Sequence, residues 1–242
     1  MTKAALITGA SRGIGKACAI HLADCFDTII INSFRHQEEL QQTKETIEQL
    51  GTSCLMYCGD IGDYNFVKEM VTDILAKDIF IDLLVNNAAV SYVGLLTDMS
   101  IRDWNQVIQT NLTSVFNCCK EIIPQMVSNK QGHIINISSM WGLSGASCEV
   151  AYSTTKGGLN AFTQALGKEL APSNIAVNAI ACGTIDTSMN ACFSQEDIKQ
   201  LKNDIPIGRL GTCEEVAKMV RLIYESPVYL TGEIIKFDGG YL

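Results

Sequence analysis

Tyr152 and Lys156 are the two residues whose types and spacing point most directly to chemistry. They lie four positions apart, which places both side chains on one face of a helix. A phenol ordinarily keeps its proton up to about pH 10, and we expect the neighbouring ammonium to lower that pKa. Tyr152 would then act as an acid–base group near neutral pH. Because this spacing is common on surface helices, the pair needs support from other motifs, beginning with Ser139 upstream of it.

A glycine-rich segment near the start of the chain predicts a phosphate-binding turn. It reads Gly9-Ala-Ser-Arg-Gly-Ile-Gly15 and follows the apolar run 3–8, which is typical of a buried strand. A helical pattern from residue 14 to about residue 23 comes next. Glycines in this context let the backbone approach a pyrophosphate, which rests on the N-terminus of the helix. An ordinary tight turn is the alternative interpretation.

The end of the second predicted strand, residues 28–32, favours NADP over NAD. Folds that bind NAD usually carry an acidic residue here, which binds the ribose 2′-hydroxyl. This sequence has Ser33 instead, with Arg35 close by and Arg12 in the glycine-rich turn. Two guanidinium groups beside the adenosine ribose suit a 2′-phosphate. The alternative is that Arg35 is a solvated loop residue.

Strands and helices alternate along the whole chain. Apolar runs predict strands at 3–8, 28–32, 54–58, 81–85, 134–137, 175–180 and 232–237. Helical patterns cover 14–23, 38–50, 66–76, 102–126, the segment that begins near Tyr152, and 214–224. This alternation predicts an α/β, Rossmann-type doubly wound parallel sheet with helices on both faces. We expect a single domain over 1–242, in which the polar segment 188–206 forms a mobile lid on the substrate side.

Composition and charge exclude several functions. The 242 residues are 47% hydrophobic and 18% charged, which is enough to build a large core. The formal net charge of -8 argues against nucleic acid or an anionic membrane as a partner. The ten cysteines are scattered without metal-ligand spacing, so we expect reduced thiols, no metal site and a cytoplasmic protein. No apolar run is long enough for a signal peptide or a membrane span.

Together these motifs resemble the short-chain dehydrogenase/reductase family over nearly the whole chain. The resemblance implies a ketone reductase whose catalytic residues are Asn111, Ser139, Tyr152 and Lys156. Tyr152 would protonate the developing alkoxide, Lys156 would hold the nicotinamide ribose, Ser139 would bind the carbonyl oxygen, and Asn111 would hold a water. Ser138 competes for the role of Ser139, and its spacing to Tyr152 favours a structural role.

The same resemblance implies a set of cofactor-binding residues for NADP(H). They follow the first, second, third, fourth and sixth predicted strands, and Asp60 would accept from the adenine amino group. The set is Gly9, Ser11, Arg12, Gly13, Ile14, Gly15, Ser33, Arg35, Asp60, Ile61, Asn87, Ala88, Ala89, Tyr152, Lys156, Gly183, Ile185 and Thr187. Two positions depart from the family pattern, because Ala89 replaces a glycine and Cys182 replaces a proline.

Within the family, the sequence is most similar to bacterial 3-oxoacyl-acyl-carrier-protein reductases. The segments 205–211 and 230–240 carry this likeness, which implies a substrate borne on acyl carrier protein and a homotetramer or homodimer. The segment 140–150 instead resembles the branch that reduces the 5-aminopentanone group on translation elongation factor P. There, Trp141 and Glu149 could contact an ammonium group, unless Trp141 packs in the core and Glu149 is solvated. A small-ketone reductase and a binding-only redox sensor are further alternatives.

Overall fold

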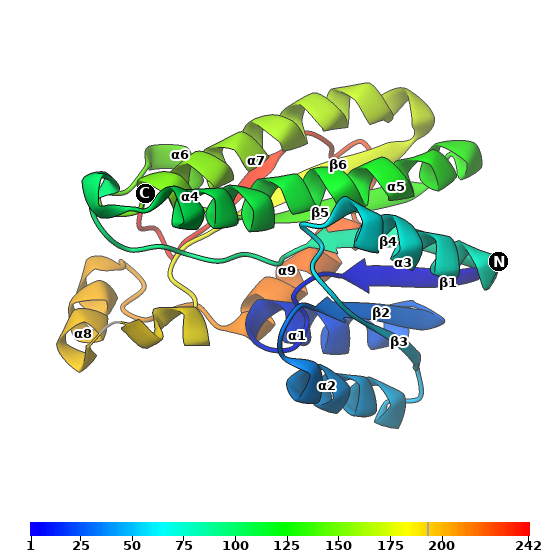
Figure 1. Cartoon of the computed structure of the whole chain (residues 1–242), viewed down its shortest axis with the longest axis horizontal. Coiled ribbons are helices and arrows are strands. Elements are labelled where there is room, and N and C mark those ends of the chain that lie inside the picture. The colour runs from blue at the N-terminus through cyan, green and yellow to red at the C-terminus, as the bar shows by residue number, and fades with distance from the viewer. Residues whose placement is uncertain (193) are drawn as a thin grey trace.

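The centre of the computed structural model, which describes residues 1–192 and 194–242, is a parallel sheet of seven strands (Figure 1). Their order across the sheet is β3-β2-β1-β4-β5-β6-β7. The strands are β1 (Thr2–Ile7), β2 (Thr28–Ser33), β3 (Ser53–Cys58), β4 (Ile79–Asn86), β5 (Gly132–Ser139), β6 (Ile175–Cys182) and β7 (Ile234–Phe237). The chain order reverses between β1 and β4, and ligands of open α/β sheets bind at such a switch point. The predicted doubly wound α/β fold is therefore confirmed.

Helices cover both faces of this sheet (Figure 1). One face packs against α1 (Gly13–His21), α2 (Gln37–Gln49) and α9 (Cys213–Glu225). The other face packs against α3 (Tyr64–Ala76), α5 (Ser114–Asn129) and α7 (Val150–Leu170). Because both faces are shielded from water, β2, β4 and β6 are buried along their entire lengths.

Local signals fix where several helices begin and end. The Asp63 carboxylate accepts a hydrogen bond from the Asn65 N–H and so caps α3. Thr212 and Glu215 form a reciprocal capping box at the start of α9. Gly51 follows the end of α2 with φ +92°, a left-handed backbone conformation that glycine adopts more easily than other residues.

The predicted helix 102–126 is wrong in one respect. The structure has α4 (Ile101–Ile108), a π-helical turn (Gln109–Thr113) and then α5. A π turn inserts one residue into the helix, and such turns occur frequently at functional sites. Here it carries Asn111, which is only 1% exposed.

Two other segments differ from the sequence prediction. The last strand begins at Ile234 rather than Gly232, because Gly232 adopts φ +78° and donates its N–H to the Val177 carbonyl at 2.7 Å. The segment 188–206 contains a short 3-10 helix (Ser188–Cys192) and α8 (Gln195–Asp204), whose start is fixed by a capping box between Ser194 and Asp197. Residue Phe193 of this predicted lid lies outside the described residues.

Within the described ranges, no helix has both the length and the apolar character needed to cross a bilayer. The same ranges contain no group of three or more His, Cys, Asp or Glu side chains placed to hold a metal ion.

Candidate active site

A cavity of about 1570 Å³ opens where β1 to β6 end, at the switch point of the sheet. Its wall contains nearly all of the predicted site residues. Those on the wall are Gly9, Ser11, Arg12, Gly13, Ile14, Ser33, Arg35, Asp60, Ile61, Asn87, Ala88, Ala89, Ser139, Tyr152, Lys156, Gly183, Ile185 and Thr187. Gly15 and Asn111 lie behind the wall rather than on it.

The glycine-rich turn is packed tightly against the end of β4. Gly9 adopts φ +65°, and a Cβ on it would lie 2.8 Å from the Ala88 Cα. The Asn87 side-chain amide donates to the Thr8 carbonyl at 2.9 Å and to the Gly9 carbonyl at 3.1 Å. Gly15 is needed for this packing, since its Cβ would lie 2.5 Å from the Asn87 Nδ2. These contacts leave the backbone exposed to the cavity at the N-terminus of α1.

The residues at the end of β2 form the part of the wall where an adenosine ribose would lie. Ser33 is buried, whereas Arg12 and Arg35 are exposed and extend over the cavity. The Arg35 guanidinium lies 5.1 Å from the centroid of the Phe34 ring. Neither arginine belongs to any of the ion pairs found in the described part of the chain. Both guanidinium groups are therefore available to an anionic ligand.

Asp60 and Ile61 flank this region from the end of β3. The Asp60 Oδ1 accepts the Gly62 N–H at 2.8 Å, which fixes the carboxylate in the turn that follows the strand. Ile61 is 5% exposed and joins the hydrophobic core on the α3 side of the sheet.

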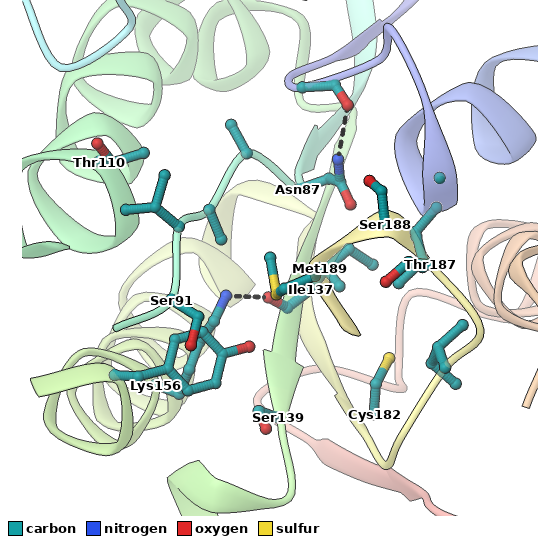
Figure 2. Close-up of a pocket in the computed structure, with 18 of the residues that line it drawn as sticks. Asn87, Ser91, Thr110, Ile137, Ser139, Lys156, Cys182, Thr187, Ser188 and Met189 are labelled. Atoms are coloured by element: carbon teal, nitrogen blue, oxygen red, sulfur yellow. Dashed lines mark hydrogen bonds between the residues drawn. The ribbon is translucent and has the colours of Figure 1, made fainter. Parts of the chain in front are cut away.

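The catalytic candidates converge between β5 and α7. Tyr152 and Lys156 lie one turn apart on α7, with the Lys156 Nζ 5.6 Å from the centroid of the Tyr152 ring. The Lys156 ammonium donates a hydrogen bond to the Ile137 carbonyl at 2.7 Å, as Figure 2 shows. Ser139, at the end of β5, lines the same cavity as Tyr152 and lowers the pKa of its phenol, and its hydroxyl accepts the Trp141 N–H at 3.1 Å. The structure thus brings together the three groups that the sequence separates.

Burial, rather than Lys156, dominates the acidity of Tyr152. Burial raises the pKa of Tyr152 above that of a free phenol, and the hydrogen bond from Ser139 offsets only part of this effect. Burial also lowers the pKa of Lys156 to about 8. Lys156 is not among the groups that shift the Tyr152 pKa in this structure, so the expected lowering of that pKa by Lys156 is not found.

Asn111 acts on the loop after β4 and not on the cavity. Its side chain accepts the Val90 N–H at 2.8 Å and donates to the Val90 carbonyl at 2.8 Å. A further hydrogen bond to the Thr155 Oγ1, at 3.2 Å, connects it to α7. All of these bonds engage the side-chain amide, so the water that we expected Asn111 to hold stays a prediction.

Ser138 has the structural environment that the sequence favoured for it. Its hydroxyl is buried and donates to the Asn160 Oδ1 at 2.6 Å, away from Tyr152. Ser139, by contrast, is among the groups that shift the pKa of Tyr152.

The cavity wall also carries a cluster of three residues, Glu149, Trp141 and Ser91. The Ser91 hydroxyl donates to the Glu149 carboxylate at 3.2 Å, and the Trp141 side chain is near enough to lower the pKa of that carboxylate. Burial is the main cause that raises the pKa of Glu149, and no cation is among the groups that shift it. Trp141 is half-buried and lines the cavity, so the alternative in which it packs in the core is wrong, whereas the solvation of Glu149 is not tested.

Sequence reasoning missed several lining residues. They are Ser91 and Val93 after β4, Asn105, Gln106 and Gln109 on or next to α4, and Met189 and Leu201 in the segment 188–206. Only the last two carried a signal, since that segment was predicted to cover the substrate side. Figure 2 shows Ser188 and Thr187 next to each other on the loop after β6, and Met189 follows them along that loop.

Comparisons with known proteins agree with this geometry. The family model described as short chain dehydrogenase matches residues 3–197. The 3-oxoacyl-[acyl-carrier-protein] reductase FabG of Aquifex aeolicus is 38% identical, over 98% of this chain and 96% of that protein. The uncharacterized oxidoreductase YmfI of Bacillus subtilis is 35% identical, over 100% of this chain and 99% of that protein.

A solved structure shares the same architecture. The 3-oxoacyl-[acyl-carrier protein] reductase from Brucella melitensis superimposes with a TM-score of 0.91 and 31% sequence identity, over 99% of this chain and 91% of that chain. The fold, the family model and these near full-length relatives lead to one conclusion. The chain belongs to the short-chain dehydrogenase family, whose members are oxidoreductases that act on CH–OH groups.

Proposed function

We propose that this protein reduces a 3-oxoacyl thioester carried by acyl carrier protein to the 3-hydroxyacyl thioester, with NADPH as the reductant. The observation that carries the proposal is the convergence of Ser139, Tyr152 and Lys156 in one cavity. Near full-length relatives with that activity in their names support the choice of substrate.

The wall of the cavity fits a dinucleotide with a 2′-phosphate. The turn from Gly9 to Gly13 offers backbone at the N-terminus of α1 for a pyrophosphate. Arg12 and Arg35 would bind the 2′-phosphate, since β2 ends in Ser33 rather than an acidic residue and both arginines are exposed. Lys156 would hold the nicotinamide ribose. When bound, the nicotinamide supplies the hydride that reduces the carbonyl carbon.

Tyr152 supplies the proton that completes the reduction. A phenol is protonated at neutral pH, so Tyr152 can donate its proton to the oxygen as negative charge develops there. Ser139 would hydrogen-bond the same oxygen and stabilise that charge. The reaction adds one hydride and one proton to the ketone, which becomes a secondary alcohol.

A substrate panel tests the proposal. We expect the purified protein to oxidise NADPH with acetoacetyl-acyl-carrier-protein and, less efficiently, with acetoacetyl-coenzyme A. Cyclohexanone, a small ketone, should be a much poorer substrate. Faster turnover of the small ketone than of either thioester would contradict the acyl-carrier assignment.

The environment of Glu149 favours a second candidate, the reduction of an amino-ketone such as the 5-aminopentanone group on translation elongation factor P. A carboxylate that is partly buried in the cavity, and has no cationic partner among the described residues, suits an ammonium group on the substrate. The indole of Trp141 adds a face for a cation–π contact. A 3-oxoacyl thioester carries no such cation.

Glu149→Gln separates the two candidates. If the amino-ketone is the substrate, this variant should raise its KM at least ten-fold and leave the KM of acetoacetyl-coenzyme A unchanged. Equal effects on both substrates would exclude a cation-specific role for Glu149.

We also infer that the protein acts in the cytoplasm as a homotetramer or a homodimer, as the family resemblance implies. Sedimentation equilibrium of the purified protein measures the mass of the assembly directly. A monomer at micromolar concentration would contradict this inference.

A further inference from the structure

Three elements that carry the site meet at the side chain of Asn160. The Ser138 hydroxyl, on β5, donates to the Asn160 Oδ1 at 2.6 Å. The Asn160 Nδ2 donates to the carbonyl of Gly142, on the short helix α6 (Trp141–Ser144), at 3.0 Å. Asn160 itself lies on α7, one turn beyond Lys156. One amide side chain thus ties the strand of Ser139, the helix of Trp141 and the helix of Tyr152 together.

The packing around Asn160 leaves little room for these elements to shift. A Cβ on Gly142 would lie 2.7 Å from the Lys156 backbone carbon and 2.9 Å from the Asn160 Nδ2. The Ser138 hydroxyl also lies 3.4 Å from the Lys156 carbonyl. Ser138 and Asn160 are 3% and 7% exposed, so water does not compete for their hydrogen bonds.

We propose that Ser138 and Asn160 form a positioning pair, which sets the distance between Ser139 and the Tyr152–Lys156 pair. The inference rests on the proposed function, since it assumes that these three residues perform the reduction. Neither Ser138 nor Asn160 needs to touch the substrate. They act through the backbone, because each is joined to an element that carries a reacting side chain.

The two hydrogen bonds of the Asn160 side chain require an amide at position 160. The side chain must accept a hydrogen bond from Ser138 and donate one to the Gly142 carbonyl at the same time. Aspartate offers only acceptors when ionised and would bury a charge, whereas leucine offers neither. A catalytic geometry held within about 0.5 Å depends on supporting groups of this kind.

The fold contains a matched control for the hydrogen bond between Ser138 and Asn160. The Asn136 Nδ2, also on β5, donates to the Oγ1 of Thr163, also on α7, at 2.8 Å. This second bond joins the same strand to the same helix, and both of its side chains are fully buried. It contacts neither α6 nor Lys156. Ser138→Ala and Thr163→Val therefore each remove a buried hydroxyl between β5 and α7. Only Ser138→Ala breaks the hydrogen bond to Asn160.

Steady-state kinetics of these variants with NADPH and acetoacetyl-coenzyme A test the proposal, at a temperature well below each variant's Tm. We expect both variants to have a lower Tm. Ser138→Ala should lower kcat at least ten-fold and change the Kd for NADPH less than three-fold, whereas Thr163→Val should keep kcat within two-fold of wild type. Ser138→Ala with wild-type kcat, or an equal loss in Thr163→Val, would overturn the proposal.

The double variant Ser138→Ala/Asn160→Leu covers the case in which Ser138→Ala does not fold. It replaces both partners with apolar groups, so neither side chain keeps an unpaired polar atom, and only the Gly142 carbonyl loses its donor. We expect it to fold with a kcat at least ten-fold below wild type, and a wild-type kcat would overturn the proposal. Tyr152→Phe distinguishes a failure of the proposed function from a failure of the positioning role of Ser138 and Asn160. An active Tyr152→Phe enzyme would contradict the proposed function itself.

Discussion

Tyr152 is a phenol whose pKa burial raises, next to a lysine whose pKa burial lowers to about 8. An acid that donates its proton during reduction must be protonated when the substrate binds, and any phenol meets that condition at neutral pH. Ser139 stands at the end of β5, where a carbonyl oxygen would be bound.

Tyr152→Phe keeps the aromatic ring and removes the acidic proton. We expect kcat for acetoacetyl-coenzyme A to fall by about 10² or more, the usual cost of losing a general acid. The Kd for NADPH, measured by fluorescence titration, should change little because the ring remains. A Phe variant that retains most of its activity would show that another group donates the proton.

The cofactor preference depends on the arginines beside β2. We predict that NADPH binds at least ten-fold more tightly than NADH, a difference of about 1.4 kcal/mol. The double variant Ser33→Asp/Arg35→Ala should reverse this order, because it supplies an acceptor for a 2′-hydroxyl and removes a partner of the 2′-phosphate. Arg102→Ala, at an exposed arginine outside the cavity wall, is the matched control. Equal Kd values for both cofactors in the wild type would refute the preference.

The sequence predicted candidate residues that the structure brings to one cavity, but it could not predict their electrostatics. The Tyr152–Lys156 spacing sets their common face, because helix geometry is local. The pKa of Tyr152 depends instead on how completely the surrounding elements bury it, and these come together only in the fold. Likewise, the bond between Ser91 and Glu149 joins residues that are 58 positions apart.

The glycine-rich turn between β1 and α1 shows how an element positions a binding surface. Gly15 has no room for a side chain, since a Cβ would collide with the Gly9 carbonyl and lie 2.5 Å from the Asn87 Nδ2. The turn can therefore stay against β4 only if this position is glycine.

Gly15→Ala should reduce the free energy of unfolding by about 1–3 kcal/mol, the usual cost of overpacking, and weaken NADPH binding. Gly157→Ala is the control, because it is also a helical glycine but its Cβ would meet nothing closer than the Gly142 carbonyl at 3.6 Å. It should be neutral or gain up to about 1 kcal/mol from helix propensity. Urea denaturation measures both, and equal stability of the two variants would contradict the packing argument.

The π turn at Gln109–Thr113 is a feature that the spacing of apolar residues could not predict. Apolar spacing predicted one helix over 102–126, and the helical path was nearly right. A single inserted residue leaves almost no trace in a 3.6-residue pattern. Its cause is tertiary, because the Asn111 amide has to reach both backbone groups of Val90.

At the scale of the whole molecule, the carboxyl ends and the amino ends of the strands differ in what they carry. The carboxyl ends of the strands carry the cavity, whereas the opposite end holds a buried polar cluster around Asp82 at β4 and His133 at β5. The Asp82 carboxylate accepts from the Tyr224 hydroxyl at 2.8 Å and pairs with the Lys3 ammonium at 3.0 Å. Neither ring nitrogen of His133 has a hydrogen-bond partner among the described residues.

His133 should make the fold sensitive to acid. Burial lowers its pKa below the ordinary value of 6.5, with Lys3 adding to this effect and Asp82 opposing it. Below pH 6.5 the unfolded chain therefore binds a proton that the folded protein does not, so stability is lost as the pH falls. His133→Phe keeps the ring contact with Tyr224 and removes the titrating group. The variant should lose less stability than wild type between pH 8 and pH 5.5 in urea titrations, and an equal loss would exclude His133 as the cause.

The doubly wound architecture followed from the alternation of strands and helices, whereas the shape of the cavity did not. Sequence motifs placed the ends of several strands on its wall. The contributions of α4 and of the segment 188–206 depend on the paths of long connections, which local patterns do not determine.

The most direct test of the central claim follows the hydride. We would incubate the protein with acetoacetyl-coenzyme A and NADPH that carries deuterium at both C4 positions of the nicotinamide, and analyse the product by mass spectrometry. The account predicts a 3-hydroxybutyryl thioester with one deuterium on its carbinol carbon, formed at least 10²-fold more slowly by Tyr152→Phe. A product without deuterium on that carbon, or no reduction of any ketone in the panel, would contradict it.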